Sequence, residues 1–142
     1  MNIVPSDFQY LLEPGTRANA FLATTLSNGS PHVTPVWFAA DGEFILVNTA
    51  RGRVKDDNMT RRPRVALLVV DPGNPYRYLQ LRGRVVEQFE DESLIHRLSK
   101  IYTGVETFKI KPGAVRVTYK ILPEKVATYD WKPEIVRTDK DA

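Results

Sequence analysis

The chain has 142 residues, of which 42% are hydrophobic and 26% charged, which is typical of one soluble globular domain spanning residues 1–142. It has no cysteine and only two histidines, which excludes disulfides, thiolate nucleophiles, iron–sulfur clusters and a three-histidine metal site within one chain. The first residues lack the pattern of a signal peptide, and no apolar run approaches the ~20 residues of a membrane span. We therefore expect a cytoplasmic protein.

Turn signals divide most of the chain into six predicted strands. Asn28–Gly29 and Asp41–Gly42 are typical hairpin turns, so the first three strands are expected to form an antiparallel meander. The apolar run at Arg64–Asp71 predicts a central strand buried on both faces. In chain order the strands are expected over Arg17–Leu26, His32–Ala39, Glu43–Thr49, Arg64–Asp71, Tyr76–Glu87 and Ala114–Tyr119, the last continuing to Tyr129 if it passes Pro123.

Two or three short helices are expected beside these strands. Phe8–Leu12 predicts one, with Ser6 or Asp7 as its cap. Glu92–Tyr102 predicts a second, because its apolar residues recur at helical spacing, with Asp91 as its cap. Many short strands with regular turns favour a closed sheet that hides its edges. We therefore predict a mainly β (α+β) fold, a six-stranded antiparallel barrel with flanking helices.

The segment 47–64 holds the net positive charge of the chain. It carries six basic residues and two acidic ones, whereas the rest of the chain has 14 basic and 15 acidic residues. Arg53 and Lys55 follow a predicted strand at the expected start of a helix, where free N–H groups and basic side chains favour a phosphate. The alternative is a solvated helix face along which Asp56, Asp57 and Arg61 pair. Asn58 lies in the same segment.

Recognisable catalytic motifs are absent from the sequence. It lacks the G-x-S-x-G, G-x-x-x-x-G-K and G-x-G-x-x-G patterns of serine hydrolases, P-loop proteins and dinucleotide-binding folds. A phosphate-holding turn without an evident nucleophile indicates that a cofactor carries the chemistry. Pro35 predicts an edge or bulge, and Trp37 beside it offers a flat surface for a ring. Alternatively, Trp37 or Phe38 is simply part of the core. His32 is a candidate proton donor by its ordinary pKa, although a surface role beside the hairpin fits it better.

The order of these motifs resembles a known family. An N-G hairpin, a P-V-W-F strand, a V-N-T strand, an R-x-K-x-x-N helix start and the strands R-R-P-R-V-A-L-L-V and Y-R-Y-L-Q-L-R-G-R-V-V-E follow one another. This is similar to the pyridoxamine 5′-phosphate oxidase-like superfamily, with its split β-barrel. Within it, the chain is most similar to the branch that uses the deazaflavin coenzyme F-420. The resemblance is clear over residues 20–87 and weak over the last third.

The resemblance implies a homodimer with two cofactor sites at its interface. The cofactor is expected to be coenzyme F-420, with FMN as the alternative, passing a hydride to an unsaturated or conjugated small-molecule substrate. Arg53 and Lys55 match the residues that hold the cofactor phosphate, and Asn58 matches the asparagine of that motif. Tyr78 matches a position that reaches across from the other subunit. The strands beside the ring and ribityl chain supply the remaining residues, which are Pro35, Val36, Trp37, Val47, Asn48 and Thr49.

Two other functions remain open from the sequence alone. A non-catalytic carrier or sensor on the same fold would show the same motifs. A barrel that binds single-stranded nucleic acid would also be basic, with surface aromatics. The positive charge forms one compact cluster instead of a long stripe, so we expect no nucleic-acid partner. Because no apolar run is long enough to span a membrane, we also expect no membrane partner.

Overall fold

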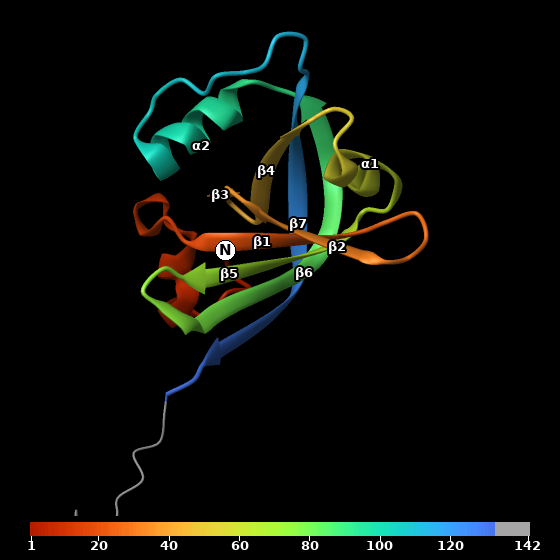
Figure 1. Cartoon of the computed structure of the whole chain (residues 1–142). Helices are drawn as coiled ribbons and strands as arrows, with labels where there is room; N and C mark the ends of the chain where they lie inside the picture. Colours follow the sequence, from red (N-terminus) through yellow and green to blue (C-terminus); the bar gives the residue numbers. More distant parts are fainter. Residues whose placement is uncertain (133–142) are drawn as a thin grey trace, which may run out of the picture.

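The computed structural model describes residues 1–132 and shows a mainly β fold (Figure 1). Its helical segments are the 3₁₀ helices η1 (Ser6–Leu12) and η2 (Pro14–Thr16) and the α-helices α1 (Val54–Arg61) and α2 (Ser93–Thr103). Its strands are β1 (Asn19–Thr25), β2 (Pro31–Val36), β3 (Ala39–Asp41), β4 (Phe44–Ala50), β5 (Arg64–Asp71), β6 (Asn74–Glu90) and β7 (Arg116–Asp130). The last ten residues of the expected domain lie outside the described residues.

The strands form one antiparallel sheet in the order β2-β1-β5-β6-β7-β4-β3. The antiparallel β fold with short helices is thus confirmed, but the six-stranded barrel is wrong in two details. There are seven strands among residues 1–132, and the sheet order has two ends, at β2 and β3, with no pairing that closes it. The predicted strand His32–Ala39 in fact breaks after Val36, and the chain starts a separate short strand at Ala39.

The predicted meander is also wrong. β1 and β2 form the expected hairpin, and the turn at Asp41–Gly42 forms a second one between β3 and β4. β2, however, lies at the sheet edge and does not pair with β4. β4 instead pairs with β7, which follows it by more than 60 residues, and β5 adds to the other side of β1. Local turn signals identify hairpins, whereas these long-range pairings depend on how the sheet curls.

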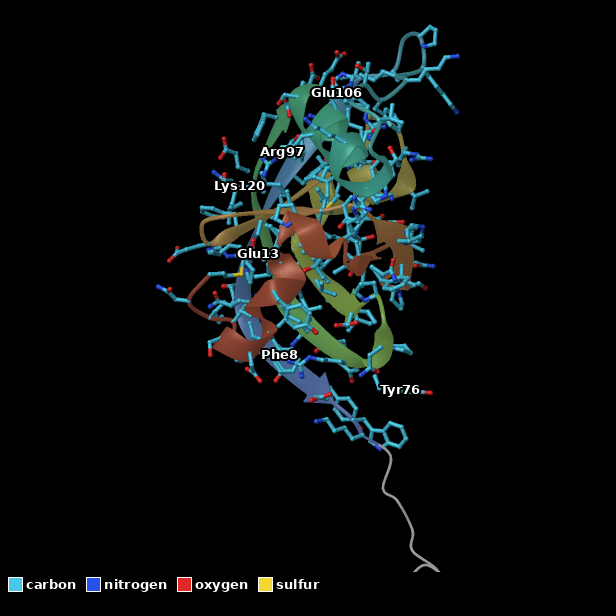
Figure 2. The ribbon with its side chains drawn as sticks, turned by 90° about the vertical axis from the view of Figure 1, so that its left-hand side faces the viewer. Phe8, Glu13, Tyr76, Arg97, Glu106 and Lys120 are labelled. Carbon is cyan, nitrogen blue, oxygen red and sulfur yellow. The ribbon has the colours of Figure 1, made fainter. Side chains whose placement is uncertain are left out.

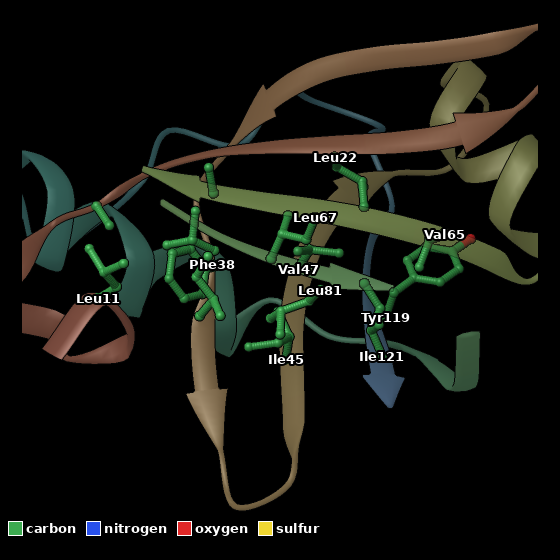
Figure 3. Close-up of a cluster of buried hydrophobic side chains, with 14 of the residues drawn as sticks. Leu11, Leu22, Phe38, Ile45, Val47, Val65, Leu67, Leu81, Tyr119 and Ile121 are labelled. Atoms are coloured by element: carbon green, nitrogen blue, oxygen red, sulfur yellow. The ribbon is translucent and has the colours of Figure 1, made fainter. Parts of the chain in front are cut away.

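β5 is central, as predicted, between β1 and β6. It is not buried on both faces, however, since Val65, Leu67 and Val69 are buried while the residues between them are partly exposed. The buried side chains join a core between the two halves of the curled sheet (Figure 3). Phe8 and Leu11 of η1 cover one side of that core. No Ser6 or Asp7 side chain caps η1, because the residue before its first turn is Pro5.

The long strands β6 and β7 bend where their pairing register shifts, at Arg82/Gly83 and at Val85/Glu87. Gly83 permits the first shift, because a Cβ built there would lie 2.0 Å from the carbonyl oxygen of Leu122. The bend lets β7 pair with β6 along its length and with β4 over its first half. β4 and β7 thereby carry side chains from distant parts of the sequence to one end of the sheet.

Candidate functional site

A cavity of about 360 Å³ lies where the start of β1, the end of β2, β4, α1 and α2 approach one another. Six of the ten predicted site residues line it: Pro35, Val36, Trp37, Asn48, Arg53 and Lys55. The structure adds nine residues to the lining, which are Ala18, Asn19, Ala20, Phe21, Ile95, Leu98, Tyr102, Phe108 and Arg116. Within the described part of the chain, the predicted phosphate-binding and ring-binding segments therefore share one cavity.

One side of the cavity is basic. Arg53 and Lys55 come from the start of α1, and Arg116 comes from the start of β7. Burial and the nearby charges of Arg53 and Arg116 lower the pKa of Lys55 from its ordinary value. Burial and Arg53 also lower the pKa of Arg116. Three cations that disfavour one another's charge create a strong preference for an anion between them.

None of these three cations pairs with a carboxylate of residues 1–132. The other basic residues of the charged segment behave differently. Arg51 bonds Asp56 at 3.0 Å, and Arg61 bonds Asp57 at 2.8 Å, so the alternative of a paired helix face is correct for Arg61. Arg62 donates to the carbonyl oxygen of Thr25 at 2.6 Å. Of the six basic residues, two therefore face the cavity and three bond within the fold, while Arg64 is exposed at the start of β5.

The other side of the cavity is aromatic. The Trp37 ring stacks on Tyr102 with centroids 5.6 Å apart and planes 7° apart. Phe108 meets Trp37 edge-on at 6.2 Å. The Tyr102 hydroxyl donates to the carbonyl oxygen of Ala18 at 3.1 Å, which joins α2 to the chain just before β1. Burial raises the pKa of Tyr102, so its hydroxyl keeps this proton at neutral pH.

Hydrogen bonds around α2 position the aromatic side. The Phe108 N–H donates to Nδ1 of His96, 2.9 Å away, which ties the loop after α2 back to that helix. At the start of α2 the Asp91 carboxylate accepts from the N–H groups of Ser93 and Leu94, as the sequence predicted for its cap. Burial opposes ionisation of Asp91, but these hydrogen bonds and one from Thr118 keep its pKa below the ordinary value. α2 therefore begins at a fixed place beside the cavity.

Four predicted site residues do not line the cavity. Val47 and Thr49 are each 2% exposed, because alternate residues of β4 face the core and only Asn48 between them faces the cavity. Asn58 lies on the buried face of α1, where its amide donates to the Thr24 hydroxyl at 2.9 Å. Tyr78 stacks on Tyr129 with centroids 5.3 Å apart. His32 also lies outside the lining.

Tyr78 belongs to a separate aromatic region. Tyr76, two residues before it, contacts Trp131 at 5.0 Å between ring centroids. Figure 2 shows Tyr76 at the opposite end of the molecule from Glu106, which lies in the loop after α2. Tyr78 is not part of the cavity lining, so its expected contact with a ligand across a dimer stays a prediction.

Sequence reasoning missed Arg116, Tyr102 and Phe108. Arg116 is the first residue of a strand and follows a loop with no motif, so its place beside Arg53 depends on the pairing of β4 with β7. The sequence did hold one signal for Tyr102. It lies four residues after Leu98, so it continues the apolar face of the predicted helix. No local pattern marks Phe108.

The family model for pyridoxamine 5′-phosphate oxidase matches residues 10–130. The chain belongs to the pyridoxamine 5′-phosphate oxidase-like superfamily. A solved structure of an F-420 reductase is 34% identical, covers 87% of this chain and 98% of that chain, and superposes with a TM-score of 0.79. None of the curated proteins matches the chain.

Two further solved structures resemble this superfamily member. A conserved hypothetical protein from Mycobacterium tuberculosis is 25% identical, covers 97% of this chain and 96% of that chain, and gives a TM-score of 0.69. A pyridoxamine 5′-phosphate oxidase-like protein from Listeria innocua is 22% identical, covers 86% of this chain and 94% of that chain, and gives a TM-score of 0.64. At this identity the match supports the fold alone. The superfamily includes oxidoreductases and flavin-binding proteins. No helix within residues 1–132 is long and apolar enough to cross a membrane.

Proposed function

We propose that the protein is an oxidoreductase that uses coenzyme F-420 to transfer a hydride to an unsaturated or conjugated organic substrate. One observation carries the proposal. Arg53, Lys55 and Arg116 line the same cavity as the Trp37 ring and pair with no carboxylate of residues 1–132. The likeness to an F-420 reductase at 34% identity supports the choice of coenzyme.

The residues present fit a planar coenzyme with a phosphate. Two guanidinium groups and one ammonium group are the side chains that best bind phosphate oxygens. Pro35 and Trp37 supply a flat apolar wall, and the volume of about 360 Å³ lies in the range of small-molecule sites. The cavity also has a polar amide, from Asn48, between the basic side and the sheet.

Each group of residues has a separate role in this proposal. The reduced deazaflavin, when bound, supplies the hydride. Arg53, Lys55 and Arg116 bind the phosphate, and Trp37 with Pro35 orients the ring. Ile95 and Leu98 are buried, so they exclude water from the wall formed by α2. Val47, Thr49 and Asn58 act from the core side, where they fix β4 and α1 without contacting the ligand.

FMN remains the second candidate, and one observation favours it. A terminal phosphate monoester carries more charge than an internal phosphodiester, and Arg116 provides a third cation beside the two that the sequence motif predicts. The same cavity would also serve a non-catalytic carrier. Rapid oxidation of the bound reduced coenzyme by a quinone acceptor, faster than without protein, would distinguish the enzyme from the carrier.

We also propose that the cavity is completed by a second copy of the chain. Phe21 is 37% exposed and Val33 is 64% exposed, on the paired strands β1 and β2. Phe21 and Pro35 both line the cavity and lie opposite each other in the β1–β2 hairpin, so this apolar surface continues directly from the site. An isologous dimer would cover the apolar surface and bring Tyr78 of the second copy towards the ligand.

The test is a comparison of ligands on the purified full chain. Coenzyme F-420 is expected to raise the melting temperature and to bind more tightly than FMN in a fluorescence titration. If FMN alone stabilises the protein, its coenzyme is FMN and not the deazaflavin. If the protein binds neither ligand, the proposal is contradicted. Sedimentation should give a dimer, and Val33→Lys should weaken it by placing a charge on the apolar surface.

A further inference from the structure

We propose that Asp56, a buried carboxylate outside the cavity, is a positioning residue that holds the turn carrying Arg53 and Lys55 and so sets the affinity for phosphate. The inference rests on the proposed function, because it concerns the same anion site. Asp56 is 6% exposed and does not belong to the cavity lining. Its effect on a ligand must therefore act through the residues that it contacts.

Asp56 ties the turn before α1 to the first turn of the helix. Its Oδ2 accepts a hydrogen bond from the Gly52 N–H at 3.0 Å, and its Oδ1 accepts one from Arg51 Nη1 at 3.0 Å. Gly52 has a φ of +90°, a conformation that side-chain-bearing residues rarely adopt. One carboxylate thus fixes both residues that immediately precede Arg53.

Tyr119 ties the same carboxylate to the sheet. Its hydroxyl donates to Asp56 Oδ1 and lies 2.9 Å from the Thr60 hydroxyl on the next turn of α1. Tyr119 is fully buried and lies in β7, paired with Val47 on one side and Gln88 on the other. Burial and Asp56 raise the pKa of Tyr119 to about 12, so the phenol remains a donor at neutral pH. The turn is therefore anchored to a buried residue of a strand that is paired on both sides.

The charge of Asp56 is balanced where it lies. Arg51 bonds it directly, so the buried carboxylate does not cancel the positive potential of Arg53 and Lys55. Arg51 also donates to the Gln88 side chain, which keeps its guanidinium directed away from the cavity. This assigns Arg51, the first basic residue of the charged segment, to orienting the turn instead of binding the anion.

The decisive experiment compares Asp56→Asn with Asp57→Asn in the full chain. Asp57 is the adjacent residue of α1, but it is exposed and pairs with Arg61 on the outer surface. Each protein is titrated with coenzyme F-420 and with the same chromophore carrying only its ribityl chain, without phosphate. Asp56→Asn replaces an acceptor of the Gly52 N–H with a neutral amide of the same shape, and removes the ion pair between Arg51 and Asp56.

Asp56→Asn is expected to weaken binding of coenzyme F-420 by about tenfold, because a turn that is not preorganised must be ordered on binding. The phosphate-free chromophore should bind it as it binds the wild type, and Asp57→Asn should bind both normally. Hydrogen exchange of the Gly52 amide without ligand should be faster in Asp56→Asn only. Where Asp56→Asn does not fold, Tyr119→Phe, which removes one hydroxyl, should show the same pattern more weakly.

Three results would overturn the inference. These are unchanged coenzyme binding in Asp56→Asn, an equal loss of both ligands, or an equal effect of Asp57→Asn. A different result would contradict the proposed function instead, namely wild-type protein that binds the phosphate-free chromophore as tightly as the coenzyme. In that case the exchange of the Gly52 amide would still decide whether Asp56 holds the turn, and unchanged exchange would overturn its role.

Discussion

Asn48 and Arg116 join the two strands beneath the cavity through a hydrogen bond of 2.8 Å from Arg116 Nε to Asn48 Oδ1. The Asn48 amide nitrogen donates to the Thr118 hydroxyl at 3.0 Å and to the Asp91 carbonyl oxygen at 3.3 Å. Asp91 in turn caps α2. A single asparagine therefore connects the basic side of the cavity to the helix that supports its aromatic side.

Asn48→Ala should lower both stability and affinity. It removes three hydrogen bonds, one of them to a charged group, and a cost of roughly 1–3 kcal/mol in the free energy of unfolding is expected. Arg116 loses its orientation, so the affinity for coenzyme F-420 should fall about tenfold. Urea unfolding and fluorescence titration measure the two effects. Unchanged affinity in the folded variant would show that Arg116 does not contact the anion.

Lys55→Met should separate binding from stability. Its lowered pKa means that the charged ammonium is less favourable in the folded protein than in the unfolded chain, so its removal should stabilise the protein without ligand. The gain should be below about 1 kcal/mol, because the side chain is only half-buried. Binding of coenzyme F-420 should nevertheless weaken, as measured by titration.

The pH dependence of this effect has a definite sign. The destabilisation by Lys55 is complete below its lowered folded pKa and disappears as the pH rises towards the ordinary lysine value of 10.5. The difference in melting temperature between wild type and Lys55→Met should therefore persist at neutral pH and shrink in alkaline buffer. Lys111→Met, in an exposed loop position, serves as the control. A variant less stable than wild type at pH 7 would contradict the electrostatic picture.

Phe108→Ala should weaken binding of the ring more than it weakens the fold. It removes the edge contact with Trp37 and the ring over which Arg116 lies, 5.4 Å from guanidinium carbon to centroid. Aromatic contacts of this kind contribute about 0.5–1.5 kcal/mol, so the phosphate-free chromophore should bind several-fold more weakly. Val105→Ala in the same loop should bind this chromophore normally. Equal affinities of the two variants would contradict a role of Phe108 in binding the ring.

Gly83→Ala should severely destabilise the fold. The new Cβ would meet backbone atoms of Leu122 and Pro123 at 2.0–2.9 Å, so β6 and β7 could not keep their bulged pairing, and a loss of more than about 3 kcal/mol is expected. Gly15→Ala is the matched control, because no atom lies within 4 Å of its added Cβ. Urea unfolding of both variants measures the difference, and similar stabilities would show that the bulge can relax.

The sequence predicted the site best where its residues are neighbours in the chain. Arg53 and Lys55 lie on one turn, and Pro35 with Trp37 lies on one strand end, so local patterns sufficed. Val47 and Thr49 were included with Asn48 because the resemblance covers a whole strand, whereas the alternation of a strand brings only one residue in two to each face. Arg116 could not be predicted, since it joins the site through a pairing between β4 and β7.

In the fold, too, the features set by neighbouring residues were predicted, and those set by distant strands were not. The β1–β2 hairpin and the cap of α2 by Asp91 follow from local chemistry, and both are confirmed. The separate strand β3 was missed because Trp37 and Phe38 continue the apolar pattern of β2, while the chain turns there to bury Phe38 and place Trp37 against Tyr102. Sheet order and the open edges depend on packing between distant strands, which periodicity does not encode.

A crystal structure of the protein with coenzyme F-420 would test the central claim most directly. We predict the phosphate within hydrogen-bond distance of Arg53 and Lys55, about 3 Å, the ring against Trp37 and Pro35, and Tyr78 of a second copy beside it. A coenzyme whose phosphate lies elsewhere, with these cations still facing solvent, would contradict the account.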